Sequence, residues 1–288
     1  MPNRSGSLRG WVATAHLGPS LACTAFTALS GWAAARAEGG GGSRTPAFLA
    51  ALAMALAQVS TGSLNDVADH RADLIHQPYK PIPRGEVTRP QVLTFALGTG
   101  AGSLIVAALA GPRALRVMAL GLTSGWSYDL WLRRTPLSWA PFAVGIGTVP
   151  LLGPAALGLP PVRPRLLMAM ASLLGLALHL ANGGPDAARD RAAGRRSLPV
   201  LLGVRGSRLG AHATLTGAAA VSVACSPGAA RGWALRGAAA GIGLLAADRA
   251  LLEAERRPGQ YPFVLPVLAA GAIAGGWLVG AAGAGAGR

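Results

Sequence analysis

Five of the 11 acidic residues in the chain form two groups with helical spacing. The first group is Asp66, Asp69 and Asp73, and the second is Asp186 and Asp190, which begins 120 residues after Asp66. Side chains three and four residues apart share one face of an α-helix, so each group would present its carboxylates together. Mg²⁺ prefers carboxylate oxygens and completes its shell with water and substrate phosphate oxygens. The spacing therefore predicts a magnesium site that holds a diphosphate between the two groups.

An amide and several cations lie close to these acidic groups along the chain. Asn65 directly precedes the first group, and Lys80 and Arg84 follow it, whereas Arg196 follows the second group. Charged hydrogen-bond donors of this kind bind phosphate oxygens strongly. We therefore predict that these four side chains contact the diphosphate.

A third polar segment covers residues 126–134 and reads Trp-Ser-Tyr-Asp-Leu-Trp-Leu-Arg-Arg. In a functional interpretation, Tyr128 and Arg133 bind the diphosphate or steer a cationic intermediate. In a structural interpretation, the segment is an aromatic belt at the membrane interface with arginines that extend to the headgroups.

Ordinary explanations exist for the acidic groups as well. They could be solvated loop charges that pair locally, as Asp69 with Arg71 or Asp186 with Arg189. Two such groups at helical spacing on the same predicted side of a membrane favour a site instead. His16 and His179 are expected to form hydrogen bonds between helices.

The composition indicates the elements that position these residues. Half of the residues are apolar (51%) and only 13% are charged, whereas about a quarter of a soluble globular chain is charged. The apolar residues occur in runs long enough to cross a hydrocarbon layer of about 30 Å. The predicted spans cover residues 11–35, 46–65, 91–110, 114–131, 137–158, 165–184, 209–226, 232–252 and 262–282. We predict an all-α, polytopic membrane protein with about nine transmembrane helices around a central cavity, in one domain over residues 1–288.

Charge counting gives the expected orientation. With the N-terminus inside, most cations fall in the inside loops, as membrane proteins require. Ten of the 11 acidic residues fall on the same side, and the exception is Glu38. We therefore expect a multi-pass protein of the cell membrane whose N-terminus and site face the cytoplasm.

Several other classes are excluded. The net charge of +15 comes from arginines spread through loops without interleaved aromatic residues, which argues against nucleic-acid binding. Cys23 and Cys225 lie inside apolar runs and form no metal or disulfide pattern. No feature points to an obligatory protein partner.

The acidic groups and their flanking residues resemble the UbiA superfamily of intramembrane prenyltransferases. The first family motif, N-D-x-x-D-x-x-x-D, is matched from Asn65 to Asp73, and residues 80–85 look like its P-I-P-x-G continuation. The second motif is D-x-x-x-D with a following G-x-x-x-L-P, and it is matched by Asp186, Asp190, Gly194, Leu198 and Pro199. The third segment departs from the common pattern. The usual Tyr position could fall on Trp126 rather than Tyr128, and Arg133 stands where Lys is common.

The resemblance implies a Mg²⁺-dependent enzyme. It would move a prenyl group from an allylic prenyl diphosphate to an aromatic or other lipophilic acceptor and release diphosphate. The five clustered aspartates would bind the metal and act in catalysis. Metal ions and nearby cations would neutralise the departing diphosphate, and a dry helical cavity would shield the allylic cation from water.

Three rival functions stay open at this level. A terpene cyclase of the same superfamily would capture the cation with its own double bonds. A polyprenyl-phosphate phosphoribosyltransferase would keep the aspartates but use a sugar diphosphate. A transporter lined with acids would place them in mid-membrane, whereas here they lie at the ends of the spans.

Overall fold

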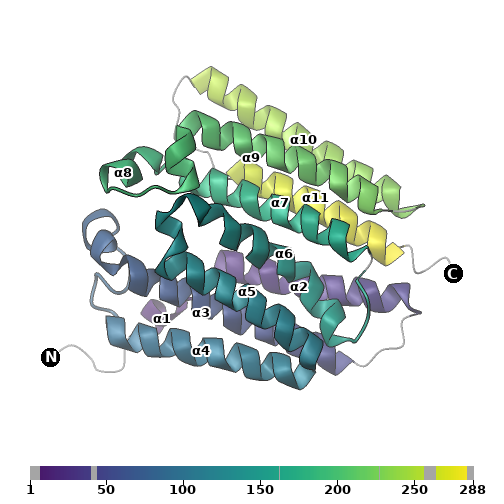
Figure 1. The fold of residues 1–288 in the computed structure, drawn as a ribbon, viewed down its shortest axis with the longest axis horizontal. Coiled ribbons are helices and arrows are strands. Elements are labelled where there is room, and N and C mark those ends of the chain that lie inside the picture. Colours follow the sequence, from purple (N-terminus) through teal and green to yellow (C-terminus); the bar gives the residue numbers. More distant parts are fainter. Residues whose placement is uncertain (1–6, 40–43, 162, 227, 256–263, 284–288) are drawn as a thin grey trace.

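The computed structural model describes residues 7–39, 44–161, 163–226, 228–255 and 264–283. Within these residues the regular structure is helical throughout, and the long helices run side by side along the molecule (Figure 1). The elements in chain order are α1 (Leu8–Thr14), α2 (Leu17–Ala37), α3 (Arg44–His76), α4 (Arg89–Ala110), α5 (Pro112–Leu130), η1 (Leu132–Arg134), η2 (Pro136–Ser138), α6 (Trp139–Ala156), α7 (Pro164–Gly183), α8 (Ala187–Ala192), α9 (Leu198–Cys225), α10 (Ala230–Glu255) and α11 (Val264–Gly283).

The all-α prediction is confirmed, and each predicted span overlaps a long helix. Five segments are long and apolar enough on their own to cross a membrane: α3, α4, α6 with η2, α7 and α11. The bent pair α1–α2 raises the count to six. In the described residues α5, α9 and α10 fail this test, and each of them carries charged residues along its length. The chain is therefore a multi-pass membrane protein, and the count of nine spans is approximate.

The first predicted span is not one straight helix. It breaks into α1 and α2 with a bend of 57°. The break occurs at His16, whose φ of 46° is left-handed, a conformation that costs energy for a residue with a side chain. The His16 imidazole is turned toward α3, so the bend brings this side chain to the first acidic group.

The helices pack mainly through two large apolar cores. One core joins α3, α4, α5 and α6, and the other joins α7, α9, α10 and α11 with one residue of α2. Glycine allows the closest approach: a Cβ built on Gly153 of α6 would lie 2.6 Å from the backbone nitrogen of Gly31 in α2. Such close packing replaces the hydrophobic effect as the force between helices in a bilayer.

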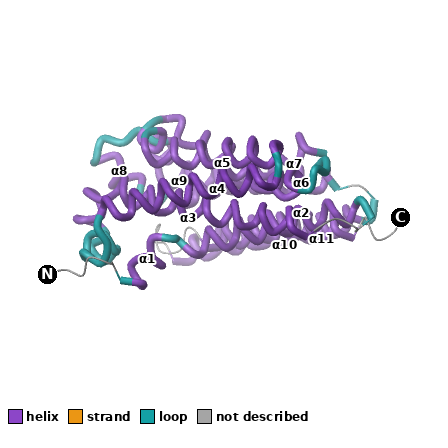
Figure 2. The backbone as a smooth tube through the Cα atoms, turned by 90° about the horizontal axis from the view of Figure 1, so that it is seen from below, coloured by secondary structure: helices purple, strands orange, loops and turns teal. Residues whose placement is uncertain are grey.

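The connecting segments gather at the two ends of the bundle (Figure 2). The last turns of α3 and the short α8 lie at the same end (Figure 1). The loop between α3 and α4 folds back against the bundle there, because Ile82 and Val87 pack with Val67 and Val92. This packing fixes the residues that follow the first acidic group.

Candidate active site

The first acidic group lies on one continuous helix, as predicted, because α3 runs 11 residues beyond the predicted end of its span at residue 65. Asp66 and Asp73 are buried, each 3% exposed. The Lys80 ammonium donates to Asp66 Oδ1 at 3.0 Å and to Asp73 Oδ2 at 2.9 Å. The two carboxylates therefore lie close enough together to share one cation.

Lys80 reaches this position from the folded loop between α3 and α4. Burial alone would lower the pKa of Lys80, but the charges and hydrogen bonds of Asp66 and Asp73 outweigh burial and raise that pKa above its ordinary value. Lys80 is therefore a cation at neutral pH, as binding of a diphosphate requires.

Asp69 joins the first acidic group to the second. Its Oδ2 lies 2.6 Å from Arg133 Nη1, and its Oδ1 lies 3.6 Å from Arg195 Nη2. The other terminal nitrogen of Arg195 donates to Asp190 Oδ1 at 3.2 Å. One guanidinium thus contacts carboxylates from both groups, which brings together residues more than 100 positions apart.

Three predicted residues lie outside this network. Arg84 pairs with Glu86 at 3.1 Å. Arg196 is exposed, and its backbone N–H donates to the Arg134 carbonyl at 3.1 Å. Asp186 pairs with Arg189 at 2.9 Å, which is the local pairing considered above as the ordinary explanation. The other local pair does not form, since Asp69 contacts Arg133 and Arg195.

The residues of the third segment, 126–134, divide between the functional interpretation and that of an aromatic belt at the membrane interface. Arg133 is buried at 6% exposure, so it does not extend to the headgroups, whereas Arg134 and Trp131 are exposed. The ring of Tyr128 packs edge-on against Phe142, with the centroids 4.9 Å apart.

The neighbouring aromatic residue, Trp126, serves another purpose. Its indole N–H donates to Ser60 Oγ at 3.1 Å, and its ring fills the space beside Gly100 of α4. Trp126 therefore packs between helices, while Tyr128 lies within electrostatic reach of Asp69, Asp190 and Arg133. The role of Tyr128 in the site stays a prediction.

Both histidines form the predicted contacts between elements. His16 Nε2 lies 3.2 Å from Asp66 Oδ1, and His179 Nε2 lies 3.0 Å from Ser138 Oγ. The prediction placed His16 between helices but did not connect it with the acidic group. The contact between His16 and Asp66 depends on the bend between α1 and α2. The dipeptide Gly18–Pro19 after the bend is the sequence signal that could have predicted it.

Sequence reasoning also missed Arg195 and Asp129. Arg195 directly precedes the predicted Arg196, and its backbone N–H donates to the Asp190 carbonyl at 2.9 Å, a turn that points its side chain inward. Asp129 accepts a hydrogen bond from Asn65 Nδ2 at 2.9 Å. A single aspartate at the end of an apolar helix gives no spacing pattern that could have marked it.

The donor chemistry of the site fits Mg²⁺. All of its candidate ligands are hard oxygens, the type that Mg²⁺ binds, and Lys80 already links two of them as a cation. Among the described residues, no three His, Cys, Asp or Glu side chains converge tightly enough to hold a metal ion unaided. A shell completed by water and phosphate oxygens agrees with this arrangement.

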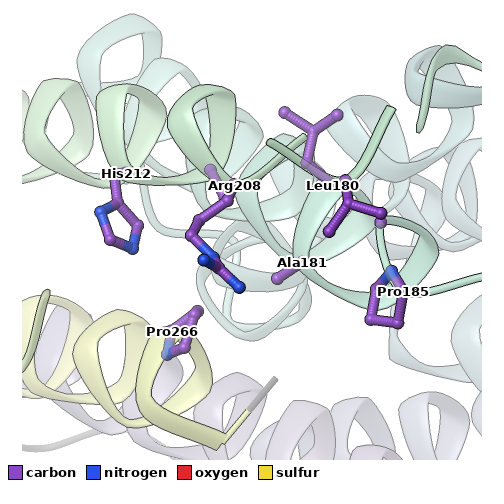
Figure 3. A pocket seen from close by; sticks show the side chains of 9 residues that line it. Leu180, Ala181, Pro185, Arg208, His212 and Pro266 are labelled. Atoms are coloured by element: carbon purple, nitrogen blue, oxygen red, sulfur yellow. The ribbon is translucent and has the colours of Figure 1, made fainter. Parts of the chain in front are cut away.

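A separate pocket lies between α7, α9 and α11 (Figure 3). The side chains of Arg208 and His212 line it opposite Pro266. His212 Nε2 also lies 2.8 Å from Asp248 Oδ2. None of the five clustered aspartates lines this pocket, so the predicted central cavity stays a prediction.

Comparison with known proteins gives a family match over most of the chain. A model described as the UbiA prenyltransferase family matches residues 24–264. Digeranylgeranylglyceryl phosphate synthase of Halobacterium salinarum is 32% identical over 216 residues, which are 74% of this chain and 76% of that protein. The protein of the same name from Methanoculleus marisnigri is 32% identical over 180 residues, or 62% of this chain and 64% of that protein. The chain thus spans less than two thirds of the Methanoculleus relative. Chlorophyll synthase of Arabidopsis thaliana is 30% identical over 50% of this chain and 40% of that protein.

Solved structures share the helix arrangement. A UbiA homolog from Aeropyrum pernix K1 has a TM-score of 0.72 and 22% identity, covering 89% of this chain and 97% of that chain. A UbiA homolog from Archaeoglobus fulgidus, solved with DMAPP and Mg²⁺, has a TM-score of 0.71 and 16% identity, covering 97% of this chain and 100% of that chain. At these identities the likeness establishes the fold.

Proposed function

The chain belongs to the UbiA prenyltransferase family, and from that premise we propose that it is a Mg²⁺-dependent intramembrane prenyltransferase. It moves a prenyl group from an allylic prenyl diphosphate to a lipophilic acceptor and releases diphosphate. The observation that carries this proposal is the contact of Arg195 with both Asp69 and Asp190. It joins the two acidic groups at one end of the bundle, where a diphosphate and its metal ions require charges of both signs.

In the proposed site the carboxylates bind the metal ions and the cations bind the diphosphate. Asp66, Asp69, Asp73 and Asp190 would hold the metal ions, and Asn65 would assist them. Asp186 belongs to the same group by sequence, and its exposed pair with Arg189 supports contact through water. Bound Mg²⁺ would supply positive charge to the departing diphosphate.

The cations beside the carboxylates hold the diphosphate itself. Lys80, Arg133 and Arg195 already surround the carboxylates, and two N–H groups of Arg133 (Nε and Nη2) are buried without a hydrogen-bond partner. Buried donors are usually paired, so these two groups are suited to phosphate oxygens. Charge aimed at the leaving group stabilises the transition state more than the ground state.

The acceptor belongs to the lipophilic class. The name of the archaeal relatives favours an alcohol that carries a glyceryl phosphate, because their product is digeranylgeranylglyceryl phosphate. This puts such an alcohol ahead of the aromatic acceptor predicted from the sequence. The new C–O bond would form as the acceptor oxygen attacks the allylic carbon, and the hydroxyl proton would leave with water or diphosphate.

Pyrophosphate release by the purified protein in nanodiscs tests the proposal. The protein would be given allylic diphosphates of several lengths with Mg²⁺ or EDTA. Each donor would be assayed without acceptor, with a prenylated glyceryl phosphate, and with an aromatic quinone precursor. We expect release that needs both Mg²⁺ and the glyceryl phosphate, and an Asp66→Asn variant should lose it.

A matched control separates loss of the site from loss of the fold. Asp248 is as buried as Asp66 but pairs with His212 away from the acidic groups. An Asp248→Asn variant should therefore keep the metal-dependent release. Release without acceptor, accompanied by a cyclic product, would instead identify a terpene cyclase. A further assay would supply phosphoribosyl diphosphate with a polyprenyl phosphate. Turnover of this pair, without turnover of any allylic diphosphate, would identify the phosphoribosyltransferase. Absence of turnover with every donor would favour the transporter.

A further inference from the structure

Asp129 is a buried carboxylate that the proposed metal and diphosphate contacts leave unused. It is 2% exposed and lies near the end of α5. Its Oδ1 accepts a hydrogen bond from Asn65, whereas its Oδ2 is buried without a hydrogen-bond partner. An unpaired buried polar atom costs roughly 1–3 kcal/mol, and more when it is charged. Such an atom in a folded protein indicates that a bound ligand or its water supplies the hydrogen-bond partner.

The contact with Asp129 determines which way the Asn65 amide faces. An amide has a donating nitrogen and an accepting oxygen. In the structure the nitrogen of Asn65 faces Asp129. This leaves the carbonyl oxygen of Asn65 free to serve as a hard ligand on the helix face of Asp69, four residues later in α3.

We propose that Asp129 is a positioning residue for the metal site. It holds the Asn65 amide so that the carbonyl oxygen is presented to the metal ion. Its free Oδ2 accepts a hydrogen bond from water that the ion retains. This inference rests on the proposed function, because it assigns a role toward the same metal ion.

A purely structural tie between α3 and α5 would not explain the free oxygen. Asp248 offers the comparison: it is equally buried at 2% exposure and pairs with His212. Neither oxygen of Asp248 is left buried without a partner. The structural carboxylate Asp248 thus has its hydrogen-bond partner, whereas Asp129 Oδ2 has none.

Binding of Mn²⁺ tests the proposal without any turnover. The free Mn²⁺ signal in electron paramagnetic resonance would be titrated with protein in nanodiscs in the presence of inorganic pyrophosphate. The Asp129→Asn variant offers Asn65 a donor as well as an acceptor, so the Asn65 amide loses its single orientation. Groups that orient metal ligands typically contribute 10–100-fold to metal affinity, so we expect Mn²⁺ to bind about 10–100 times more weakly. The Asp248→Asn variant loses the same buried charge elsewhere and should bind as the wild type does.

A double-mutant cycle shows whether Asp129 acts through Asn65. If Asp129 acts through Asn65, the Asp129→Asn substitution should weaken Mn²⁺ binding far less in the Asn65→Ala background than in the wild-type background. Independent, additive losses would overturn the orientation role, and so would wild-type affinity in the single Asp129→Asn variant. Circular dichroism of the metal-free variants checks that each one is folded.

The same titration separates this inference from the proposed function. Wild-type protein that binds no Mn²⁺ and releases no pyrophosphate would contradict both. Wild-type binding that is lost in Asp66→Asn but unchanged in Asp129→Asn would contradict only the role of Asp129.

Discussion

Asp69 differs from the other carboxylates of the site because it contacts cations from two later parts of the chain. Arg133 follows α5, and Arg195 follows α8. Asp66 and Asp73 share Lys80, which is only seven residues from Asp73. The charge balance at Asp69 therefore depends on tertiary structure, whereas that of its neighbours is largely local.

Adjacent arginines give a first prediction at this scale. Arg195 contacts both acidic groups, while the side chain of Arg196 is exposed. Removal of one preorganised donor typically costs 10²–10³ in rate. We expect Arg195→Gln to lower kcat for pyrophosphate release at least tenfold more than Arg196→Gln does. Equal losses in the two variants would show that the inward position of Arg195 has no part in catalysis.

A second pair of adjacent arginines provides an independent comparison. Arg133 is buried against Asp69 with unpaired donors, whereas Arg134 is exposed. Arg133→Gln should reduce kcat/KM for the prenyl diphosphate by about 100-fold, and Arg134→Gln should change it less than about threefold. The comparison is decided by steady-state kinetics with Mg²⁺ at saturation. A large loss in Arg134→Gln would point to attraction by the whole basic surface instead.

The sequence predicted these residues unevenly, for a physical reason. Asp66, Asp69 and Asp73 share a face because helical spacing is a local property. Arg195 and Asp129 were missed because their contacts depend on how α8 and α5 pack against α3, and no spacing within one segment reports that. Arg84 looked equivalent to Lys80 in sequence, but the folded loop turns it toward Glu86.

At the scale of elements, α2 and α6 cross closely at Gly31 and Gly153. A methyl group on Gly153 would meet the α2 backbone, which cannot move aside as a side chain can. Overpacking of this kind typically costs 1–3 kcal/mol. We expect Gly153→Ala to lower the Tm of the protein in detergent by several degrees.

Gly98 is the matched control for this prediction. It also lies inside a membrane helix, α4, but a Cβ there would meet nothing within 4 Å. Gly98→Ala should keep or slightly raise the Tm, because alanine favours a helix by up to about 1 kcal/mol. A similar fall in both variants would mean that glycine itself, and not the crossing, matters in these helices.

The helices were predictable because a chain that spans a bilayer must satisfy its backbone hydrogen bonds internally, and a long apolar run does so as a helix. The helix boundaries were predicted less accurately. The predicted span 46–65 continues to His76 as α3, since nothing after Asn65 breaks a helix. The break at His16 was not predicted, although Gly18 and Pro19 follow it closely. A proline at this place cannot continue a helix that starts at Leu8, because it lacks the N–H and clashes with the preceding turn.

At the scale of the whole molecule, α8 lies at one end of the bundle (Figure 2). Arg195 joins Asp190 of α8 to Asp69 of α3, so the charged site occupies that end. The charge bias of the loops places that end in the cytoplasm, which is a prediction about orientation. Ala193 is exposed at the site end, and Glu38 is exposed just beyond the last turn of α2 at the other end.

Cysteine labelling checks this orientation. In a background with Cys23 and Cys225 replaced by serine, Ala193→Cys should react with a membrane-impermeant maleimide only after the cells are opened. Glu38→Cys should react in intact cells. The reverse pattern would place the site outside.

The order of the cations along the chain has a consequence for how the protein is made. A chain that enters the membrane from its N-terminus carries Lys80 in with Asp66 and Asp73, so those two carboxylates are neutralised almost at once. Asp69 must wait for Arg133 and then for Arg195. Until Arg133 arrives, Asp69 is a charge without a cationic partner next to an apolar phase, which is costly. The interval between emergence of α4 from the ribosome and arrival of Arg133 is therefore a stage at which the incomplete chain carries an uncompensated charge.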